Sequence, residues 1–445
     1  MLKCCRQVFL PHLRLLSTQT PSPNLQASTI EIGNHVFQKD DWSNVTPKIL
    51  SYIKSEKHLQ KHHPLSIIRK RIVEYFYNTY KNNRGTPLFS VYDQVSPVVS
   101  VHQNFDNLLI PAGHPSRAKS DCYYINKHYL LRAHTTAHQI EMIKSGLDNY
   151  IIVGEVYRRD EIDSTHYPVF HQLDAVRLIG KEKLFGNFLD LEIFENDFKS
   201  NPQKIQTIIS NSKCIDQSKQ PCHTLEAVKL TEHELKSVLV GLTQHLFGDN
   251  IEYRWVDTCF PFTQPSWELE IYHKGDWMEV LGCGIMRNEI LLNSGVSNSI
   301  GFAFGLGLER LAMILFDIPD IRLFWSNDSG FLTQFNEEDN RPNKYKAIST
   351  FPQCSNDLSF WLPEGVEIDN FSPNDFYDIA RGIGGDMIEQ ITLVDKFKHP
   401  KTGKSSLCFR IVYRHMEKTL TQAEVNETHG KIAKVVSESF NVVIR

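Results

Sequence analysis

Residues 156–174 read Val-Tyr-Arg-Arg-Asp-Glu-Ile-Asp-Ser-Thr-His-Tyr-Pro-Val-Phe-His-Gln-Leu-Asp, and they decide how the middle of the chain folds. Two β-rich hydrophobic runs, 149–157 and 169–178, flank a polar connection at 161–165. Apolar runs separated in this way predict a β-hairpin with a long loop. The ends of the two strands should then lie side by side.

Three side chains near these strand ends can serve one ligand. We expect Arg158, His166 and Phe170 to lie on one face of the hairpin. Guanidinium and imidazolium groups suit a polyphosphate, and an aromatic ring can stack on a base. The hairpin therefore predicts a nucleotide site.

A second motif lies at residues 301–310, Gly-Phe-Ala-Phe-Gly-Leu-Gly-Leu-Glu-Arg. It should begin as a strand, turn through Gly305 and Gly307, and enter a helix at 308–316. Arg310 would lie in the first helical turn, where free N–H groups attract anions. The motif lacks the third glycine of a dinucleotide-binding fingerprint.

Short β-rich runs between turn residues predict a mostly antiparallel sheet from about residue 88 to 310. An amphipathic helix should follow Pro64, and another should occupy 222–247. We interpret residues 186–221, rich in Asn, Gln, Ser and Lys, as a surface insertion. Beyond the hairpin, the expected strands are 251–256, 267–271 and 277–280.

The final residues, from about 349, predict a separate small domain of order βαββαβ, the ferredoxin-like fold. Ser372-Pro373 should open one helix, and Thr421 to Glu424 forms a capping box for the other. The expected strands are 358–362, 388–397, 407–413 and 442–444.

Basic residues are concentrated in this domain between Lys396 and Lys418, against one acid, Glu417. Such a hairpin suits a phosphate backbone, and the alternative is a solvated surface hairpin. The seven basic residues are Lys396, Lys398, Lys401, Lys404, Arg410, Arg414 and Lys418.

The composition is that of a globular protein, with 41% hydrophobic and 22% charged residues and a net charge of -4. No apolar run is long enough to span a membrane. Nine cysteines without a Cys-x-x-Cys pair fit a reducing compartment. The start of the chain has Lys3, Arg6 and Arg14 and no acid before Glu31, which is typical of a mitochondrial transit peptide.

Together these motifs resemble class II aminoacyl-tRNA synthetases. Residues 156–174 are similar to motif 2 of that class, and 301–310 to motif 3. Arg132-Ala-His-Thr-Thr136, Phe260-Pro-Phe262 and Gly282-Cys-Gly284 resemble the wording of the phenylalanyl branch. The C-terminal unit resembles the ferredoxin-like anticodon-binding domain of single-chain members.

The resemblance implies an α+β fold, in which a class II antiparallel-sheet catalytic domain with flanking helices precedes a C-terminal ferredoxin-like domain. The implied divisions are a transit peptide at 1–25, a catalytic domain at 30–320, a linker at 321–348 and an anticodon-binding domain at 349–445.

The resemblance also implies roles for residues. Arg158, His166 and Arg310 should be catalytic and bind ATP, with Phe170 stacked on adenine. Thr136 and Asp174 stand where the family frequently has serine and glutamate, so their functional groups are kept and Asp174 is shorter. The implied phenylalanine-binding residues are His134, Thr136, Ala137, His138, Gln139, Arg158, Thr165, His166, Tyr167, Gln172, Leu173, Asp174, Phe260, Phe262, Glu279, Ala303 and Phe304.

The implied reaction is ATP-dependent formation of phenylalanyl-adenylate and transfer to the terminal adenosine of tRNA(Phe) in the mitochondrial matrix. The basic hairpin should bind the tRNA, and Mg²⁺ should accompany ATP, with its ligands left open between Glu268 and Glu270. We expect a monomer without an editing domain. The alternatives are a synthetase for another amino acid and an inactive paralogue that binds RNA.

Overall fold

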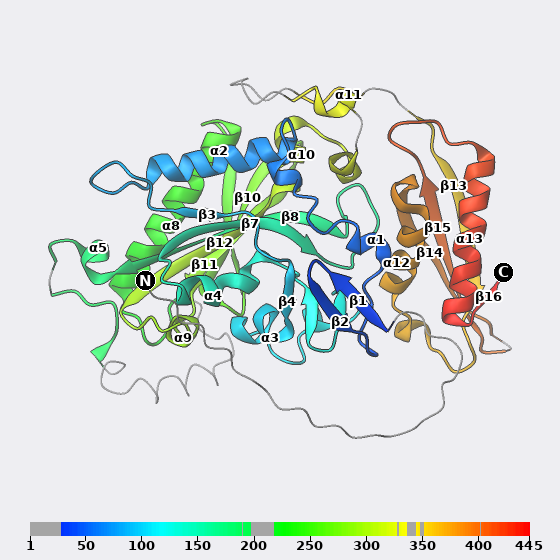
Figure 1. The fold of residues 1–445 in the computed structure, drawn as a ribbon, viewed down its shortest axis with the longest axis horizontal. Coiled ribbons are helices and arrows are strands. Elements are labelled where there is room, and N and C mark those ends of the chain that lie inside the picture. The colour runs from blue at the N-terminus through cyan, green and yellow to red at the C-terminus, as the bar shows by residue number, and fades with distance from the viewer. Residues whose placement is uncertain are drawn as a thin grey trace, which may run out of the picture.

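The computed structural model describes residues 28–188, 190–196, 218–326, 329–335, 344–347, 351–400 and 402–445. The expected transit peptide lies outside these residues, as does most of the expected insertion. Figure 1 shows a large unit built around a sheet and a small C-terminal unit beside it.

The large unit is organised by a seven-stranded sheet with the order β3-β7-β8-β12-β11-β10-β9. Every neighbouring pair is antiparallel except β3 and β7, which confirms the expected mostly antiparallel sheet. In the motif 2 hairpin, β7 pairs along its whole length with residues 169–177 of β8, with Tyr157 opposite Val169. The strands are β3 (Ser90–Tyr92), β7 (Asn149–Tyr157), β8 (Val169–Gly180), β9 (Tyr253–Thr258), β10 (Thr263–His273), β11 (Asp276–Met286) and β12 (Ser299–Gly307).

Helices cover both faces of this sheet (Figure 1). On one face α2 (Pro64–Thr79), α8 (Leu225–Phe247) and α10 (Leu308–Phe316) bury their apolar sides in the main core. On the other face α4 (Gln139–Lys144) and α9 (Asn288–Asn293) pack in a smaller cluster. Both long helices and the helix after motif 3 are as predicted, although β12 runs through Gly305 and Gly307 without turning.

Smaller elements close the edges of the large unit. At the start of the region expected to form the sheet, residues 88–101 contain only two short strands, β3 and β4. A three-stranded sheet of order β4-β6-β5 lies beside the catalytic sheet, next to a separate β1-β2 hairpin. These elements are β1 (Thr29–Ile32), β2 (His35–Gln38), α1 (Pro47–Leu50), β4 (Val98–Ser100), α3 (Val101–Asn104), β5 (Tyr124–Asn126), β6 (Tyr129–Leu131) and α5 (Lys181–Phe185).

The C-terminal unit has the predicted order βαββαβ, and its sheet order is β14-β15-β13-β16. Thr421 and Glu424 form the expected capping box, whereas the Ser372 side chain makes no capping hydrogen bond. The elements are β13 (Cys354–Trp361), α12 (Pro373–Gly384), β14 (Ile388–Lys398), β15 (Ser405–Tyr413), α13 (Gln422–Phe440) and β16 (Val443–Ile444).

The segment that we expected to be a linker begins inside the large unit. Residues Ile321–Trp325 form a buried 3-10 helix, and Phe331 in α11 (Ser329–Leu332) and Phe335 are buried in the main core. The predicted start of the linker at residue 321 is therefore wrong, because residues 321–325 are all buried in the large unit.

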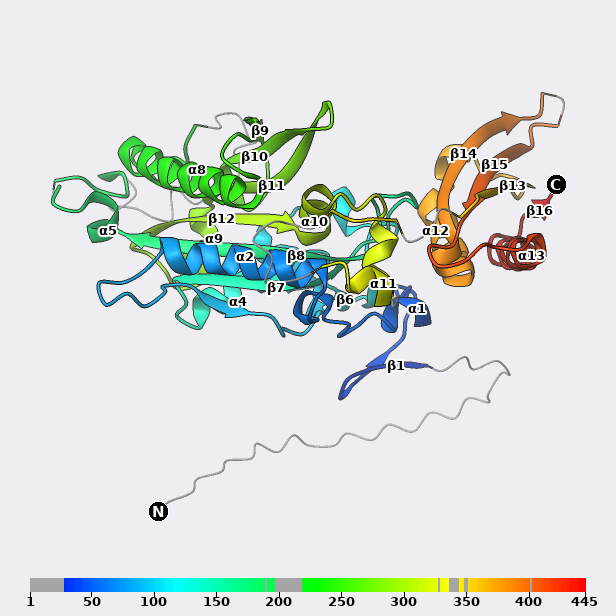
Figure 2. The same cartoon turned by 90° about the horizontal axis from the view of Figure 1, so that it is seen from above.

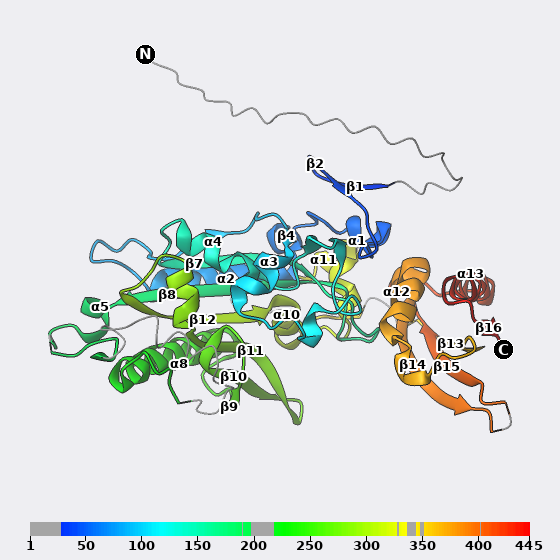
Figure 3. The ribbon, with the colours of Figure 1, turned by 90° about the horizontal axis from the view of Figure 1, so that it is seen from below.

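The two units pack against each other, as Figures 2 and 3 show from above and below. The Tyr123 hydroxyl donates to Asp378 at 2.8 Å, and Arg159 lies 2.9 Å from Asp375. Ile162, in the loop of the motif 2 hairpin, is buried in the core of the C-terminal unit. No described helix is long and apolar enough to cross a membrane.

Candidate active site

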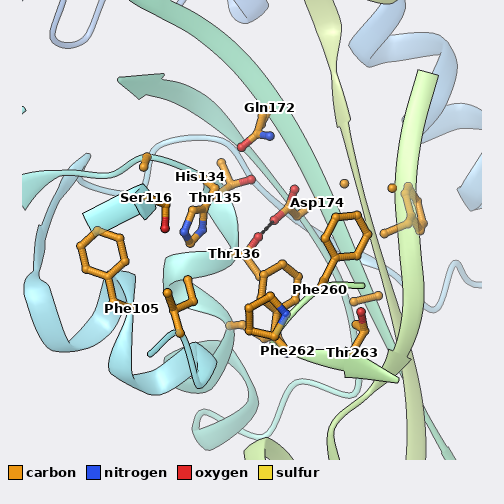
Figure 4. Close-up of a pocket in the computed structure, with 18 of the residues that line it drawn as sticks. Phe105, Ser116, His134, Thr135, Thr136, Gln172, Asp174, Phe260, Phe262 and Thr263 are labelled. Carbon is orange, nitrogen blue, oxygen red and sulfur yellow. Dashed lines mark hydrogen bonds between the residues drawn. The ribbon is translucent and has the colours of Figure 1, made fainter. Parts of the chain in front are cut away.

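A cavity of about 730 Å³ lies on the face of the catalytic sheet that carries the smaller cluster. Figure 4 shows its lining, with β8 on one side and the residues around Phe260 on another. Loops from three parts of the chain complete the walls, including Phe105, Ser116 and His134. This cavity collects the majority of the expected site residues.

The alternation of β8 places two polar side chains in the cavity. Gln172 and Asp174 line it, while Leu173 between them is buried in the main core on the opposite face. Across the sheet Asp174 pairs with Gly305, where a Cβ would lie 2.6 Å from Asp174 Oδ1. Gly305 of motif 3 is thus required for the placement of Asp174.

Asp174 is the acidic centre of the cavity. Its carboxylate accepts a hydrogen bond from the Thr136 hydroxyl (Figure 4). Burial raises the pKa of Asp174 to about 6, although hydrogen bonding to Thr136 and the charge of Arg158 oppose the shift. At neutral pH the buried carboxylate is largely ionised, which suits a cationic ammonium group.

Two neighbouring groups have buried polar atoms without partners among the described residues. Neither ring nitrogen of His134 is hydrogen-bonded, and neither is Oε1 of Gln172. Burial, reinforced by the charge of Arg158, lowers the pKa of His134 to about 3, so its imidazole is neutral. Because unsatisfied buried polar atoms are unfavourable, these atoms fit a polar ligand in the cavity.

An apolar slot adjoins this polar end. The rings of Phe260 and Phe262 stack with centroids 5.7 Å apart and planes 7° apart. A Cβ on Gly282 would lie 2.9 Å from the Phe260 ring, so glycine makes room for that ring. Ala303 also borders the slot. An aromatic side chain of matching width fits this space.

Phe304 contributes to the slot less than expected. It borders the cavity, but its ring stacks on Phe76 of α2 with centroids 5.4 Å apart, on the opposite side of the sheet. The physical reason is strand alternation, because successive side chains of β12 point to opposite faces. We expected the ring of Phe304 to form part of the slot, and this was wrong. Phe304 borders the cavity, but its ring packs on the other side of the sheet.

Arg158 and Phe170 lie together at the end of the hairpin. The Arg158 guanidinium lies 5.2 Å from the centre of the Phe170 ring, and its Nε donates to the Ala133 carbonyl at 2.8 Å. Arg158 also lines the cavity, and so does Glu279. Arg310 is half exposed and pairs with Glu279 at 3.1 Å, so the motif 3 arginine lies beside the same opening.

His166 lies in the loop of the hairpin, because β7 ends at Tyr157 and β8 begins at Val169. Its Nδ1 lies 2.7 Å from the Asp163 carboxylate, and this hydrogen bond raises the pKa of His166. The imidazolium form is favoured, which suits a phosphate. The structure does not place His166 in the cavity lining.

Several other expected binding residues also lie outside the cavity lining, each for a local reason. Tyr167 is buried. Its hydroxyl forms a hydrogen bond of 2.6 Å with the Tyr52 hydroxyl and donates one of 2.8 Å to the carboxylate of Asp386 in the C-terminal unit. His138 contacts Arg132 at 3.1 Å, and Thr165 bonds to Asp163 within the loop. The expected phenylalanine-binding residues that do not line the cavity are Ala137, His138, Thr165, His166, Tyr167 and Leu173, and the expected ATP-binding residues Phe170 and Arg310 also lie outside the lining.

The structure adds lining residues that sequence reasoning missed. Phe105, His114 and Ser116 come from the loops before β5, and Asn374 comes from the start of α12 in the C-terminal unit. The motif His114-Pro-Ser116 in an otherwise unassigned loop was the one available signal. No local pattern could indicate Asn374, because it reaches the site through packing of the two units.

The family comparisons agree with this geometry. Residues 50–200 and 223–335 match the family described as tRNA synthetases class II core domain (F), and residues 349–445 match the ferredoxin-fold anticodon binding domain. The fold and the cavity are thus those of a class II aminoacyl-tRNA synthetase, which confirms the predicted fold class.

Full-length relatives narrow this class. A probable mitochondrial phenylalanine–tRNA ligase of Drosophila melanogaster is 70% identical over 94% of this chain and 92% of its own length. The mitochondrial phenylalanine–tRNA ligases of Mus musculus and Saccharomyces cerevisiae are 49% and 35% identical, covering 96% and 97% of this chain and 91% and 99% of their own lengths. The chain belongs to the family of mitochondrial phenylalanine–tRNA ligases.

Proposed function

We propose that this chain activates phenylalanine with ATP and transfers the phenylalanyl group to the terminal adenosine of tRNA(Phe) in the mitochondrial matrix. The observation that carries the proposal is the cavity, where an aromatic slot ends at the carboxylate of Asp174 and at unpaired polar atoms of His134 and Gln172. A free amino acid with an aromatic side chain satisfies both ends.

In the first step, the carboxylate of phenylalanine attacks the α-phosphorus of ATP, and pyrophosphate leaves. Asp174 holds the ammonium group, and Thr136, His134 and Gln172 orient the amino acid. Phe260 lies along the aromatic ring. Positioning of the reactants supplies much of the rate, because the reaction needs little proton transfer from the protein.

The nucleotide lies over the hairpin end in this proposal. Arg158 holds the α-phosphate and then the adenylate, where its charge stabilises the negative charge of the transition state. His166 and Arg310 bind the outer phosphates, and Phe170 stacks on adenine. Binding of ATP would draw the loop side chain of His166 toward the opening where Arg310 lies.

Of the two residues expected to hold Mg²⁺, Glu268 fits a divalent cation better than Glu270, and Glu279 joins it beside Arg310. Burial and then the nearby charge of Glu279 raise the pKa of Glu268, so these two carboxylates repel each other. Glu270 is paired with Arg254 at 2.6 Å, whereas the partner of Glu279 is Arg310, which binds the outer phosphates in this proposal and would release Glu279. We therefore assign Glu268 and Glu279 to Mg²⁺, which would neutralise charge on the phosphates.

Pyrophosphate exchange driven by ATP and single amino acids tests this function. Phenylalanine should support exchange, and tyrosine should do so with a kcat/KM lower by about a hundredfold, because an apolar slot rejects an added hydroxyl weakly. Exchange only with another amino acid would indicate the other-synthetase alternative. No exchange with any amino acid would leave the RNA-binding paralogue.

Arg158→Ala should abolish exchange without unfolding the protein, because the phosphate loses its main counter-charge. The matched control is Arg254→Ala, which removes a half-exposed arginine from the outer strand β9. This control should retain exchange. Wild-type rates in Arg158→Ala would contradict the assignment of Arg158.

A further inference from the structure

A buried cluster of His58, Glu155 and His171 lies outside the catalytic cavity. Among the residues that the structure describes, it is the one group of this kind whose candidate ligand atoms all lie within 4.8 Å of one another. Both histidines are 0% exposed, and Glu155 is 5% exposed. His58 lies in a 3-10 helix before α2, while Glu155 and His171 lie opposite each other on β7 and β8.

The outer hydrogen bonds of the two histidines fix the state of their inner nitrogens. Nδ1 of His171 lies 2.7 Å from the Glu309 carboxylate, and Nε2 of His58 lies 3.3 Å from the Asp93 carbonyl oxygen. Both partners accept hydrogen bonds, so these nitrogens act as donors, and the opposite ring nitrogens are the ones available to a metal ion. The remaining nitrogens, Nε2 of His171 and Nδ1 of His58, are buried without a hydrogen-bond partner in the described structure.

The inner atoms of the cluster face one another without bonding to one another. Glu155 accepts its hydrogen bonds from the segment beside His58, and neither inner ring nitrogen has a partner among the described residues. The N–H of Glu56 donates to Oε1 of Glu155 at 2.7 Å. A buried carboxylate therefore lies beside two ring nitrogens that the described residues leave unsatisfied, which is unfavourable in a buried space.

We infer that His58, Glu155 and His171 bind a divalent transition-metal ion, with Zn²⁺ as the best fit. Two imidazole nitrogens and one carboxylate oxygen are ligands that zinc takes, and water can fill the fourth position. Metal-binding histidines commonly donate their other N–H to a carboxylate or carbonyl, as both histidines do here. Mg²⁺ and Ca²⁺ prefer oxygen ligands and fit this cluster poorly.

Metal binding would tie three segments together. Zinc–ligand bonds of about 2.0–2.2 Å need ligand atoms within about 4.4 Å of one another, which is close to the 4.8 Å limit within which these atoms lie. The ion then joins the segment around His58 to both strands of the motif 2 hairpin. Through Glu309, it also fixes the start of α10, next to Arg310. The metal ion would have a structural role next to the residues proposed to bind ATP. The inference of this metal site does not depend on the identity of the amino-acid substrate.

Titration of the full chain with metal ions tests the site. After treatment with a chelator, the protein should bind one equivalent of Co²⁺ with visible bands typical of tetrahedral N/O coordination, and Zn²⁺ should displace it with a Kd at or below about 1 μM. Zn²⁺ should also raise the Tm, because it binds only the folded state. A wild-type protein that binds neither ion would overturn the inference in favour of a shared proton or a buried water.

Two substitutions remove one ligand each while keeping the outer hydrogen bond. His58→Gln can still donate to the Asp93 carbonyl, and His171→Asn can still donate to Glu309. Each should weaken Co²⁺ binding by at least about 100-fold and abolish the shift in Tm. The control is His223→Gln, which alters another buried histidine with unpaired ring nitrogens and should bind Co²⁺ as the wild type does.

Two outcomes of these substitutions would overturn the assignment. Unchanged Co²⁺ binding by His58→Gln and His171→Asn would place the ion elsewhere. If either variant fails to fold, the wild-type spectrum decides, because bands of octahedral oxygen coordination would exclude a site with two imidazoles.

Discussion

Asp174 shows how one residue can serve binding at the expense of stability. Its pKa of about 6, against 3.8 for the ordinary side chain, means that the folded protein holds the proton more tightly than the unfolded chain does. Burying the carboxylate therefore destabilises the fold increasingly as the pH rises from about 4 to about 6, and the full penalty applies above about 6. The difference of about 2 pH units corresponds to about 3 kcal/mol.

We expect Asp174→Asn to be more stable than the wild type by about 1–3 kcal/mol at pH 7.5, because the neutral amide avoids this penalty. The gain should shrink as the pH falls from about 6 and become small near pH 4, where Asp174 is protonated in the folded protein and about half protonated in the unfolded chain. The same variant should raise the KM for phenylalanine by about 100-fold or more. Urea unfolding at both pH values and steady-state exchange measure these effects.

Asp163 provides a control of opposite sign. Burial alone would raise the pKa of Asp163, but hydrogen bonds from His166 and Thr165 outweigh burial and lower it. Its ionised form therefore stabilises the fold at neutral pH, and this contribution disappears as the pH falls through the lowered pKa. Asp163→Asn should lose stability at pH 7.5. A less stable Asp174→Asn at that pH would contradict the burial argument.

The β14–β15 hairpin is less basic than its sequence indicates. Acidic residues from outside residues 396–418 pair with most of its basic side chains. Lys396 has no ion pair among the described residues, and Lys401 lies outside them. The pairs are Lys398–Glu367, Lys404–Glu364, Arg410–Asp357, Arg414–Glu389 and Lys418–Glu424.

If this hairpin contacts tRNA, as we propose, its basic residues should contribute unequally. Lys396→Ala should reduce the slope of log K against log salt by about 0.7–0.9, because a free lysine releases a counterion when it meets a phosphate. Arg410→Ala should change the slope less, because Asp357 already neutralises Arg410 at 2.8 Å. Filter binding of tRNA(Phe) over a range of salt measures both slopes, and equal slopes would contradict the role of the ion pairs.

At the scale of the whole molecule, the C-terminal unit packs on the catalytic hairpin. Arg159, next to the proposed phosphate ligand Arg158, pairs with Asp375 at 2.9 Å and lies 3.6 Å from Asp378. Arg381 donates to the carbonyl of Asp160 at 3.0 Å. The loop that we assign to ATP binding is therefore held from the side of the anticodon-binding unit.

Asp378→Ala should weaken this packing by about 1–3 kcal/mol, because it leaves the buried Tyr123 hydroxyl without its hydrogen-bond partner and removes the 3.6 Å contact with Arg159. Small-angle scattering should show a larger radius of gyration for the variant. Asp375→Ala is the control, since its half-exposed ion pair is worth less. Equal radii for Asp378→Ala and the wild type would contradict this view of the interface. The forward scattering also tests our proposal of a monomer, which a dimeric mass would contradict.

Much of the fold follows from patterns a few residues long. The β-rich hydrophobic run at 169–178 and the polar connection before it predicted β8, and Thr421 with Glu424 predicted the start of α13. Antiparallel hairpins link neighbours in sequence, so their order along the chain predicts much of the sheet. The bounds of strands were less predictable, and β10 and β11 are longer than expected because pairing extends each strand.

The sequence by itself determined the class of protein and the residues of the cavity that lie on a strand face, such as Gln172 and Asp174. Tertiary structure alone decided which distant groups meet. It brought Asn374 to the cavity and set His58 beside Glu155. The physical reason is that side-chain direction follows from the local backbone geometry, which a short stretch of sequence determines. Contacts between segments distant in sequence depend instead on how whole units pack.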